Sequence, residues 1–571
     1  MSRAHALLPA LLIVGATTLA YLGSFDGGFV SDDRVAIEHN PKLQGLTADN
    51  LVAIFTTFDD SNYIPIKVLS LAVDQAVWGP QPFGYHLGNL ALHIACALLL
   101  WRILLGMRFS AGAALLTALL WALHPLQVES VAFMAERKNV LSGAFFFAAF
   151  LLYMRFAASG GWRVWAAVLA LFVLALLSKM NTVVLPALCL AYEAMLARRI
   201  PRRAWLASLP LFAAGALVVW YNLAGNTLHG ARFHGGSAVA TWLSSSTVVF
   251  RYLAAVVDPT HLRSFYYIPL HGSPLDPPVA LALLGLAAFG AGLLWLAPRR
   301  PREAFWLFWF AVSLAPMLNI VPFPTMMQDR YMYLALVGLL AAPIGALDDA
   351  LRGVAARRLA AAAAAGLALA WGLLTVRQVE AWTDELSLWR DWALEEWYLP
   401  VDVGPLRQPG SDDRLALLEA AAAAAPGDVV VQHNLGALRY ERGDLPGALA
   451  ALEAAQRLGA DAHAMPLLNL GRARLRSGDP AGAADALRRA VALEPYAYWA
   501  HLNLARAALA TGDQPTADAA LAACLRIRPD AARSLEREFS PGISTQRAPR
   551  ARRGAEGADA GRAGRAATVG R

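Results

Sequence analysis

Apolar segments of about 17 to 20 residues recur along this 571-residue chain. A helix of that length spans the hydrocarbon core of a bilayer and pairs its backbone polar groups within the segment. The segments begin near residue 5 and stop near residue 376, and 57% of the whole chain is hydrophobic. The sequence therefore predicts an all-α fold, with a polytopic membrane bundle over residues 1–376 and a separate C-terminal part.

Short Arg-rich links between the apolar segments predict how the bundle is oriented, because Lys and Arg near helix ends stay on the cytoplasmic side. Placing five such links and the N-terminus inside gives about eleven spanning helices and leaves the C-terminal part outside. The predicted spans cover residues 5–23, 84–104, 111–127, 140–156, 163–178, 182–197, 204–222, 279–297, 303–320, 331–347 and 359–376. The loop 24–83 then lies outside, and its eight acidic residues against three basic ones agree with that side.

Segment 242–257 is an apolar stretch that this scheme does not place across the membrane. The run from Ser244 to Ser246 and the charge of Arg251 make it more polar than a typical span. These residues favour a helix that lies at the outer membrane surface over a twelfth span.

The formal net charge of +7 is better explained by the orientation of the helices in the membrane than by nucleic-acid binding. The Arg clusters lie in the links between apolar segments and in the tail after Arg547. We therefore expect membrane lipid as the surroundings and no nucleic-acid partner. Lysine occurs at four positions only, whereas Arg and Ala are abundant, as in GC-rich bacterial coding. This predicts a bacterial inner (cytoplasmic) membrane, with the N-terminus cytoplasmic and the C-terminal part periplasmic. The three widely spaced cysteines indicate neither a disulfide framework nor a zinc site.

A repeat with a period near 34 residues follows residue 426, as in tetratricopeptide (TPR) helical hairpins. Three equivalent sets of residues carry it: Asn434, Asn469 and Asn503; Gly443, Gly478 and Gly512; and Ala448, Ala483 and Ala517. Stacked hairpins form a solenoid with a concave groove that binds proteins or peptides. The predicted divisions are a connector with a degenerate repeat at 377–426, TPR repeats at 427–537 and a disordered tail at 538–571.

An acidic pair, Asp32 and Asp33, follows the first predicted span in the segment FVSDDRVAI. A carboxylate beside the membrane surface suits general-base chemistry on an incoming hydroxyl. For the bare pair, a solvated loop or a helix cap is the simpler explanation. From the sequence, at most one of the two adjacent side chains is expected to lead a reaction, because they point in different directions in an extended segment.

Other ionisable residues gather at the predicted outer ends of the spans. The link after the third span contains His124, Glu129, Glu136, Arg137 and Lys138. Its Arg and Lys either hold a lipid phosphate or anchor the interface. Lys179 lies between two apolar segments, and Asp329 with Arg330 precedes the tenth span. Charged residues in such places are expected to be functional.

His86 and His93 are seven residues apart, on one face of a helix. A third ligand at matching spacing is missing, so we expect packing or hydrogen-bonding roles and no metal site.

Four blocks occur in order along the chain: YIPIKVLSLAVDQAVWGPQPFGYHLGNLALHI, LLWALHPLQVESVAFMAERKNVLSGAFFF, LLSKMNTVVLP and MQDRYMYLALVGL. With the TPR repeats after them, they resemble bacterial relatives of the transmembrane-and-TPR-repeat O-mannosyltransferases. More distantly, the chain is similar to protein O-mannosyltransferases and other glycosyltransferases of the GT-C fold.

The resemblance implies an inverting transferase that uses a polyprenyl-phosphate-linked sugar as donor, with no obligatory divalent metal. It makes Asp32 or Asp33 the base, with Asp32 favoured, and makes Glu129 an assisting residue. Arg137, Lys138, Lys179 and Arg330 would neutralise the departing phosphate, while His86, His124 and Asp329 are further candidates for the site.

Three functions stay open from the sequence. One is an enzyme that moves a sugar to a protein hydroxyl or an envelope glycan. The others are a membrane scaffold that recruits envelope proteins through its TPR groove and a transporter or polymerase of lipid-linked glycans. Cationic groups at the outer helix ends favour the enzyme, because a transporter would keep its charges near the membrane midplane.

Overall fold

The computed structural model describes residues 3–59, 62–229, 233–234, 237–266, 268–323, 325–351, 353–388, 411–528 and 531–539. Within these ranges the chain consists of helices joined by short links, with no β-strand, which confirms the all-α prediction. Much of the predicted connector, 389–410, and nearly all of the predicted disordered tail lie outside the described residues. The domain boundaries therefore stay predictions.

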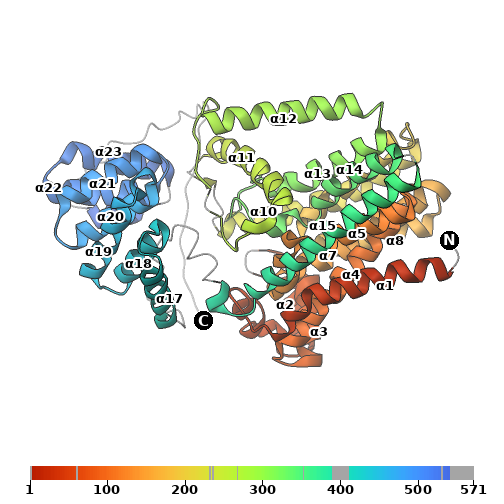
Figure 1. Ribbon diagram of the computed structural model, residues 1–571, viewed down its shortest axis with the longest axis horizontal. Helices are drawn as coiled ribbons and strands as arrows, with labels where there is room; N and C mark the ends of the chain where they lie inside the picture. The colour runs from red at the N-terminus through yellow and green to blue at the C-terminus, as the bar shows by residue number, and fades with distance from the viewer. Residues whose placement is uncertain are drawn as a thin grey trace, which may run out of the picture.

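The N-terminal bundle contains long apolar helices and several short ones that lie in its links (Figure 1). Its helices are α1 (Arg3–Tyr21), α2 (Ala48–Thr56), α3 (Pro65–Trp78), α4 (Pro82–Gly106), α5 (Ala111–Ala122), α6 (Val128–Ala132), α7 (Arg137–Ser159), α8 (Trp162–Ser178), α9 (Leu185–Met195), α10 (Arg202–His229), α11 (Ala238–Val257), α12 (Pro277–Leu296), α13 (Pro301–Leu314), α14 (Leu336–Ala350) and α15 (Val354–Glu380).

Seven helices in the described residues are long and apolar enough to cross a membrane, or eight if the bent pair α5 and α6 is one broken span. The predicted count of eleven is therefore not confirmed. Each of the eleven predicted ranges contains a helix, but α5, α8, α9, α13 and α14 are too short to qualify alone. Polar links interrupt several of them, since α5 ends before His124 and α8 ends before Lys179.

Helix α11 passes the same test of length and composition, although the sequence favours a surface helix there. Near its start, Trp242 Nε1 donates to the carbonyl of Asn319 at 3.0 Å, and near its end His124 Nε2 lies 3.2 Å from the Val256 carbonyl. Asn319 and His124 both lie at predicted outer ends of spans. These contacts place both ends of α11 at the same end of the bundle and favour a surface helix, which stays a prediction.

The bundle has two polar ends that match the predicted inner and outer links. At one end Ser110 bonds Asp348, and Arg302 pairs with Asp349 at 2.8 Å. At the other end the amide of Ser31 donates to Glu385 at 3.0 Å, which joins the loop after α1 to the segment after α15. The side of the membrane that each end faces stays a prediction.

The interior between these ends is packed with aromatic rings. Phe146, Phe150, Phe305 and Trp309 are buried, and the Trp309 ring meets the Phe150 ring edge-on at 5.1 Å. In contrast, only 11% of the apolar stretch of α12 is buried. Such an apolar helix with an exposed surface is suited to contact with lipid.

The C-terminal region is a TPR array, as the repeat period predicts. Its helices are α17 (Ser411–Ala424), α18 (Val429–Glu441), α19 (Leu445–Arg457), α20 (Ala464–Arg476), α21 (Pro480–Leu493), α22 (Tyr498–Thr511), α23 (Gln514–Ile527) and α24 (Ala532–Phe539). The turn glycines have positive φ, +82° at Gly443 and +88° at Gly478, a conformation that favours glycine. The following aspartates cap the second helices, as Asp444 does through the Gly447 amide at 3.0 Å.

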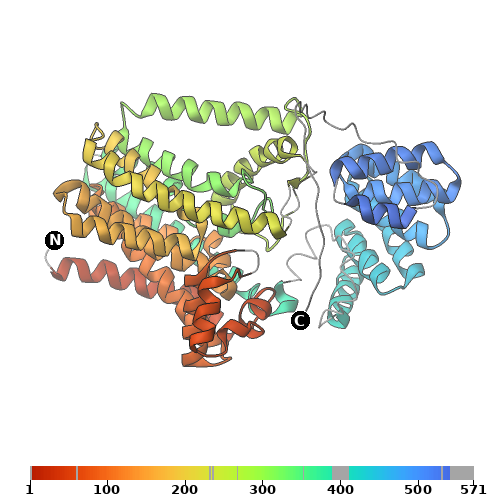
Figure 2. The ribbon, with the colours of Figure 1, turned by 180° about the vertical axis from the view of Figure 1, so that it is seen from behind.

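The array lies beside the end of the bundle that is remote from the N-terminus (Figures 1 and 2). Helix α1 runs from the N-terminus toward that end, where it leads into the loop that holds Asp32 and Asp33 (Figure 2). The repeats and the predicted site residues of this loop therefore share one end of the molecule.

Candidate active site

Five charged residues from three separate links meet at the end of the bundle near the repeats. We call them the ionic cluster: Glu129, Glu136, Lys138, Lys179 and Arg330. The Arg330 guanidinium bridges both carboxylates, with Nη1 2.5 Å from Glu129 Oε1 and Nε 3.3 Å from Glu136 Oε1. Glu136 also forms an ion pair with Lys138, whose Nζ lies 2.8 Å from Glu136 Oε1. The side chains of both acids are nearly inaccessible, at 3% and 2%, whereas Lys138 is 26% exposed.

The chain forms this cluster because short turns replace helix at each link. His124 caps a 3-10 turn that begins at Pro125, and α6 places Glu129 on a single helical turn. Proline suits the first position of such a turn, since it lacks an N–H. Glu136 immediately precedes α7, and Arg330 lies in the 3-10 segment Asp329–Met332 before α14.

Lys179 enters the cluster from the extended link between α8 and the next 3-10 turn, with φ −160°. Its Nζ donates to Asn139 Oδ1, and Asn139 in turn donates to Glu136 at 2.9 Å. Burial lowers the pKa of Lys179 to about 7, although the nearby Glu136 carboxylate opposes that shift. The amine therefore changes its charge near neutral pH.

The acidic pair divides into one buried and one exposed carboxylate. Asp33 is fully buried and accepts hydrogen bonds from the backbone amides of Val30 at 3.2 Å and Ala135 at 2.5 Å. Burial raises its pKa to about 8, against the opposing effect of these hydrogen bonds. Asp32 is exposed on the same turn. Because Ala135 is next to Glu136, the bond to Asp33 fixes the loop after α1 against the ionic cluster.

Asp329 lies beside the cluster and is buried, with the Tyr266 hydroxyl donating to it at 2.7 Å. Burial raises its pKa well above the ordinary range, and the negative charge of Glu129 adds to the effect. The structure therefore favours a neutral carboxyl at Asp329, next to the Glu129–Arg330 pair.

Three predicted site residues lie outside the ionic cluster. Arg137 pairs with Asp74 at 2.5 Å, bonds the carbonyl of Tyr85 and contacts Asn89. His124 accepts from the Leu126 amide at 3.1 Å and packs on Trp371. His86 is buried against the backbone of Gly27. The contacts of Arg137 and His124 are those of structural residues, whereas both ring nitrogens of His86 are buried without a hydrogen-bond partner among the described residues. A direct role of any of the three stays a prediction.

One residue of the site was not singled out from the sequence: Tyr266, the donor to Asp329. Glu136, which the sequence places in the same ionisable link as Glu129, is the carboxylate shared by Arg330 and Lys138. Tyr266 lies in the loop after α11, where no sequence pattern indicates a contact with residue 329.

No group of three or more His, Cys, Asp and Glu residues suited to a metal ion occurs in the described part of the chain. The carboxylates of the cluster are neutralised by Arg330 and Lys138.

The fold and the site define a polytopic helical membrane protein that carries an enclosed ionic cluster beside a TPR array. Residues 71–224 match the sequence profile of the dolichyl-phosphate-mannose-protein mannosyltransferase family, and residues 474–537 match that of the tetratricopeptide repeat. The matched membrane segment contains Glu129, Glu136, Lys138 and Lys179. The resemblance to TPR-containing O-mannosyltransferases is thereby confirmed.

Curated relatives from several animals are named as protein O-mannosyl-transferases. The chain is 35% identical to Protein O-mannosyl-transferase TMTC1 of Mus musculus over 156 residues, which are 26% of this chain and 17% of that protein. It is 29% identical to Protein O-mannosyl-transferase TMTC3 of Homo sapiens over 200 residues, 33% of this chain and 22% of that protein. It is 31% identical to Protein O-mannosyl-transferase Tmtc3 of Drosophila melanogaster over 186 residues, 27% and 20% of the two chains. The chain therefore spans about a fifth of the length of the relatives it matches.

Proposed function

We propose that this chain is an inverting glycosyltransferase that moves a sugar from a polyprenyl-phosphate donor to a protein hydroxyl or an envelope glycan. The observation that carries the proposal is the charge balance of the ionic cluster. Arg330, Lys138 and Lys179 are opposed by two carboxylates, so the cluster has one cation in excess when Lys179 is protonated. An excess cation in a poorly hydrated site is well suited to bind a phosphate.

In the proposed reaction, the acceptor hydroxyl attacks the anomeric carbon of the sugar from the face opposite the phosphate. The new carbon–oxygen bond forms as the bond to the phosphate oxygen breaks, and the electron pair leaves with the lipid phosphate. Lys138, Lys179 and Arg330 stabilise the negative charge of that leaving group. Configuration at the anomeric carbon inverts.

Asp32 is the proposed base that takes the hydroxyl proton, because it is exposed beside the buried Asp33. Asp33 acts as a positioning residue through its bonds to Val30 and Ala135. The preceding Ser31 has φ +49°, a strained value for a residue other than glycine, and such strain often accompanies functional sites. Glu129 orients Arg330 in the same scheme.

Mannose as the sugar, the periplasmic face of a bacterial inner membrane and a protein acceptor belong to the same proposal. The names of the relatives support mannose and a protein acceptor, and the Arg-rich links support the orientation. The TPR array supports a protein partner.

The test is a donor panel applied to the purified chain in lipid nanodiscs with a threonine-containing peptide. Polyprenyl-phosphate mannose, polyprenyl-phosphate glucose and GDP-mannose are each offered with the label in the sugar. We expect transfer from a polyprenyl-phosphate sugar only, with the opposite anomeric configuration in the product. Transfer from GDP-mannose alone would contradict the lipid-phosphate donor, and no transfer from any donor would favour the scaffold.

A further inference from the structure

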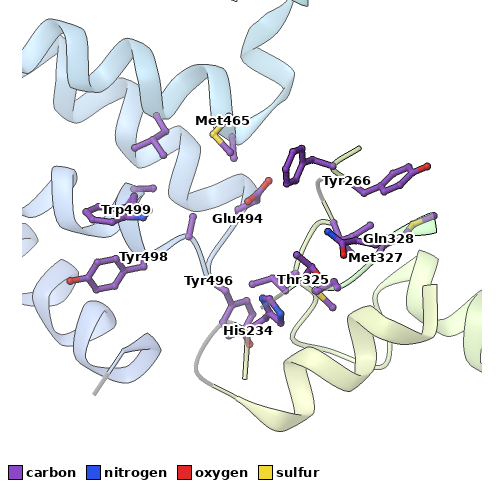
Figure 3. A pocket seen from close by; sticks show the side chains of 18 residues that line it. His234, Tyr266, Thr325, Met327, Gln328, Met465, Glu494, Tyr496, Tyr498 and Trp499 are labelled. Carbon is purple, nitrogen blue, oxygen red and sulfur yellow. The ribbon is translucent and has the colours of Figure 1, made fainter. Parts of the chain in front are cut away.

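A cavity of about 310 Å³ lies between the TPR array and the end of the bundle that holds the ionic cluster. We call it the interdomain cleft. One wall consists of the link from Thr325 to Gln328 together with His234, Phe265, Tyr266, Ile268 and Leu270. The other wall consists of Ala464, Met465 and Leu468 of α20 and the turn from Glu494 to Ala500 that leads into α22. Figure 3 shows the two walls facing each other across the gap.

We propose that the interdomain cleft binds an extended segment of the acceptor polypeptide, with apolar or aromatic side chains beside the hydroxyl residue. This inference rests on the proposed function, because the bound segment is the substrate that receives the sugar.

The lining is chemically suited to apolar side chains of varied shape. Three methionines, Met326, Met327 and Met465, lie in the walls together with Tyr266 and Trp499. Methionine adapts to different partners, and aromatic rings supply large contact areas at low entropic cost. A cavity of this size lies at the lower end of the range for ligand pockets and accommodates about two side chains.

Polar groups in the cleft match a peptide backbone better than a lipid phosphate. Gln328 is buried and lines the cleft, and its Oε1 atom accepts no hydrogen bond within the described part of the chain. An amide oxygen of this kind suits a backbone N–H of an extended peptide. Among the described residues of the lining there is no Lys or Arg, and one of them, Glu494, is acidic. The described lining therefore offers an anionic headgroup neither Lys nor Arg.

The cleft lies next to the candidate active site. Tyr266 lines the cleft and donates its hydroxyl to Asp329 at 2.7 Å, next to Arg330 of the ionic cluster. Gln328 precedes Asp329 in the chain and lines the same wall. A polypeptide held by the repeats in this cleft thus has its neighbouring residues beside the cluster. The arrangement gives the TPR array a role in presenting the acceptor.

The test measures binding of a peptide to the full chain in lipid nanodiscs, with no sugar donor present. The probe is a fluorescein-labelled 12-residue peptide of alternating threonine and valine with one central phenylalanine. Ala497→Arg places a large cation in the cleft, and Met327→Ala shortens a side chain on the opposite wall without touching the repeats. Ala492→Arg is the matched control, because Ala492 is an exposed residue of α21 outside the cleft.

We expect Ala497→Arg to weaken peptide binding by about tenfold or more and Met327→Ala by about fivefold, as for other central contacts of an interface. Ala492→Arg should stay within about twofold of the unmodified chain. Equal binding by all four proteins, or equal loss in Ala492→Arg and Ala497→Arg, would overturn the proposal. Unchanged peptide binding with a raised KM for the lipid donor in Ala497→Arg would also overturn it, because the cleft would then hold lipid.

The same data separate this inference from the proposed function. Peptide binding that follows the expected order in a chain that transfers no sugar would support the cleft and contradict the enzyme. Sugar transfer with a KM for the peptide that none of the three substitutions changes would support the enzyme and contradict the cleft.

Discussion

Arg330→Met provides a direct test of the ionic cluster, since it removes the cation between two enclosed carboxylates. Arg330 lies 2.5 Å from Glu129 and 3.3 Å from Glu136, and the side chains of these acids are only 3% and 2% exposed. Breaking a buried ion pair by removing one partner costs about 3–5 kcal/mol, because the remaining charge is left without compensation. At about 2 °C per kcal/mol, we expect the apparent Tm to fall by roughly 6–10 °C.

The assay is thermal unfolding of the purified chain in one detergent, followed by intrinsic tryptophan fluorescence at a fixed heating rate. Arg439→Met is the matched control, because Arg439 pairs with Glu419 at 2.9 Å on the exposed surface of the repeats. An exposed pair contributes only about 0–1 kcal/mol, so this control should lower Tm by no more than about 2 °C. Adding Glu129→Gln to Arg330→Met should restore part of the loss, since it removes one unpaired charge. Equal Tm values for Arg330→Met and Arg439→Met would refute the reasoning.

Three further outcomes are expected. Because the pKa of Lys179 is about 7, its amine is cationic below that pH and neutral above it. The KM for the lipid donor should therefore rise between about pH 6 and pH 8. In Lys179→Arg, whose side chain stays charged, KM should depend less on pH over the same range. Asp33→Ala should lower stability by about 1–3 kcal/mol in denaturant titrations, because it leaves buried backbone amides unpaired, whereas Asp33→Asn should lose less. Gly338→Ala should lower Tm more than Gly366→Ala, because a Cβ at Gly338 would lie 2.1 Å from the Trp306 carbonyl and one at Gly366 would meet nothing within 4 Å.

Local sequence patterns are sufficient for the repeats. The turn glycines and the alanines of each second helix occur at the predicted places. Each of these features depends on neighbours within one hairpin, so a period near 34 residues identifies them. The apolar segments likewise coincide with helices, although their length did not establish how many cross the membrane.

The candidate site was only partly predictable, because its residues lie far apart in the chain. Charged residues at predicted outer helix ends did indicate Glu129, Lys138, Lys179 and Arg330, which the fold brings together. The same criterion also selected Arg137, which the structure pairs with Asp74. Sequence position alone does not tell which side of α7 a cation faces.

The two members of the acidic pair also needed the structure to be distinguished. Adjacent positions in the sequence predict that they point differently, and the fold buries Asp33 while leaving Asp32 exposed. The contact between Asp33 and the Ala135 amide joins segments about a hundred residues apart. No periodicity or motif encodes such a contact.

The most direct test of the proposed function is transfer of labelled sugar from polyprenyl-phosphate mannose to a threonine peptide by purified wild type, Asp32→Asn and Asp33→Asn. We expect Asp32→Asn to lose at least about a hundredfold in kcat while it keeps its Tm, because a general base contributes roughly that much. Asp33→Asn should keep measurable transfer in proportion to its folded fraction. Transfer by Asp32→Asn at the wild-type rate would contradict the assignment of the base, and loss of transfer in Asp33→Asn alone at an unchanged Tm would move that role to Asp33.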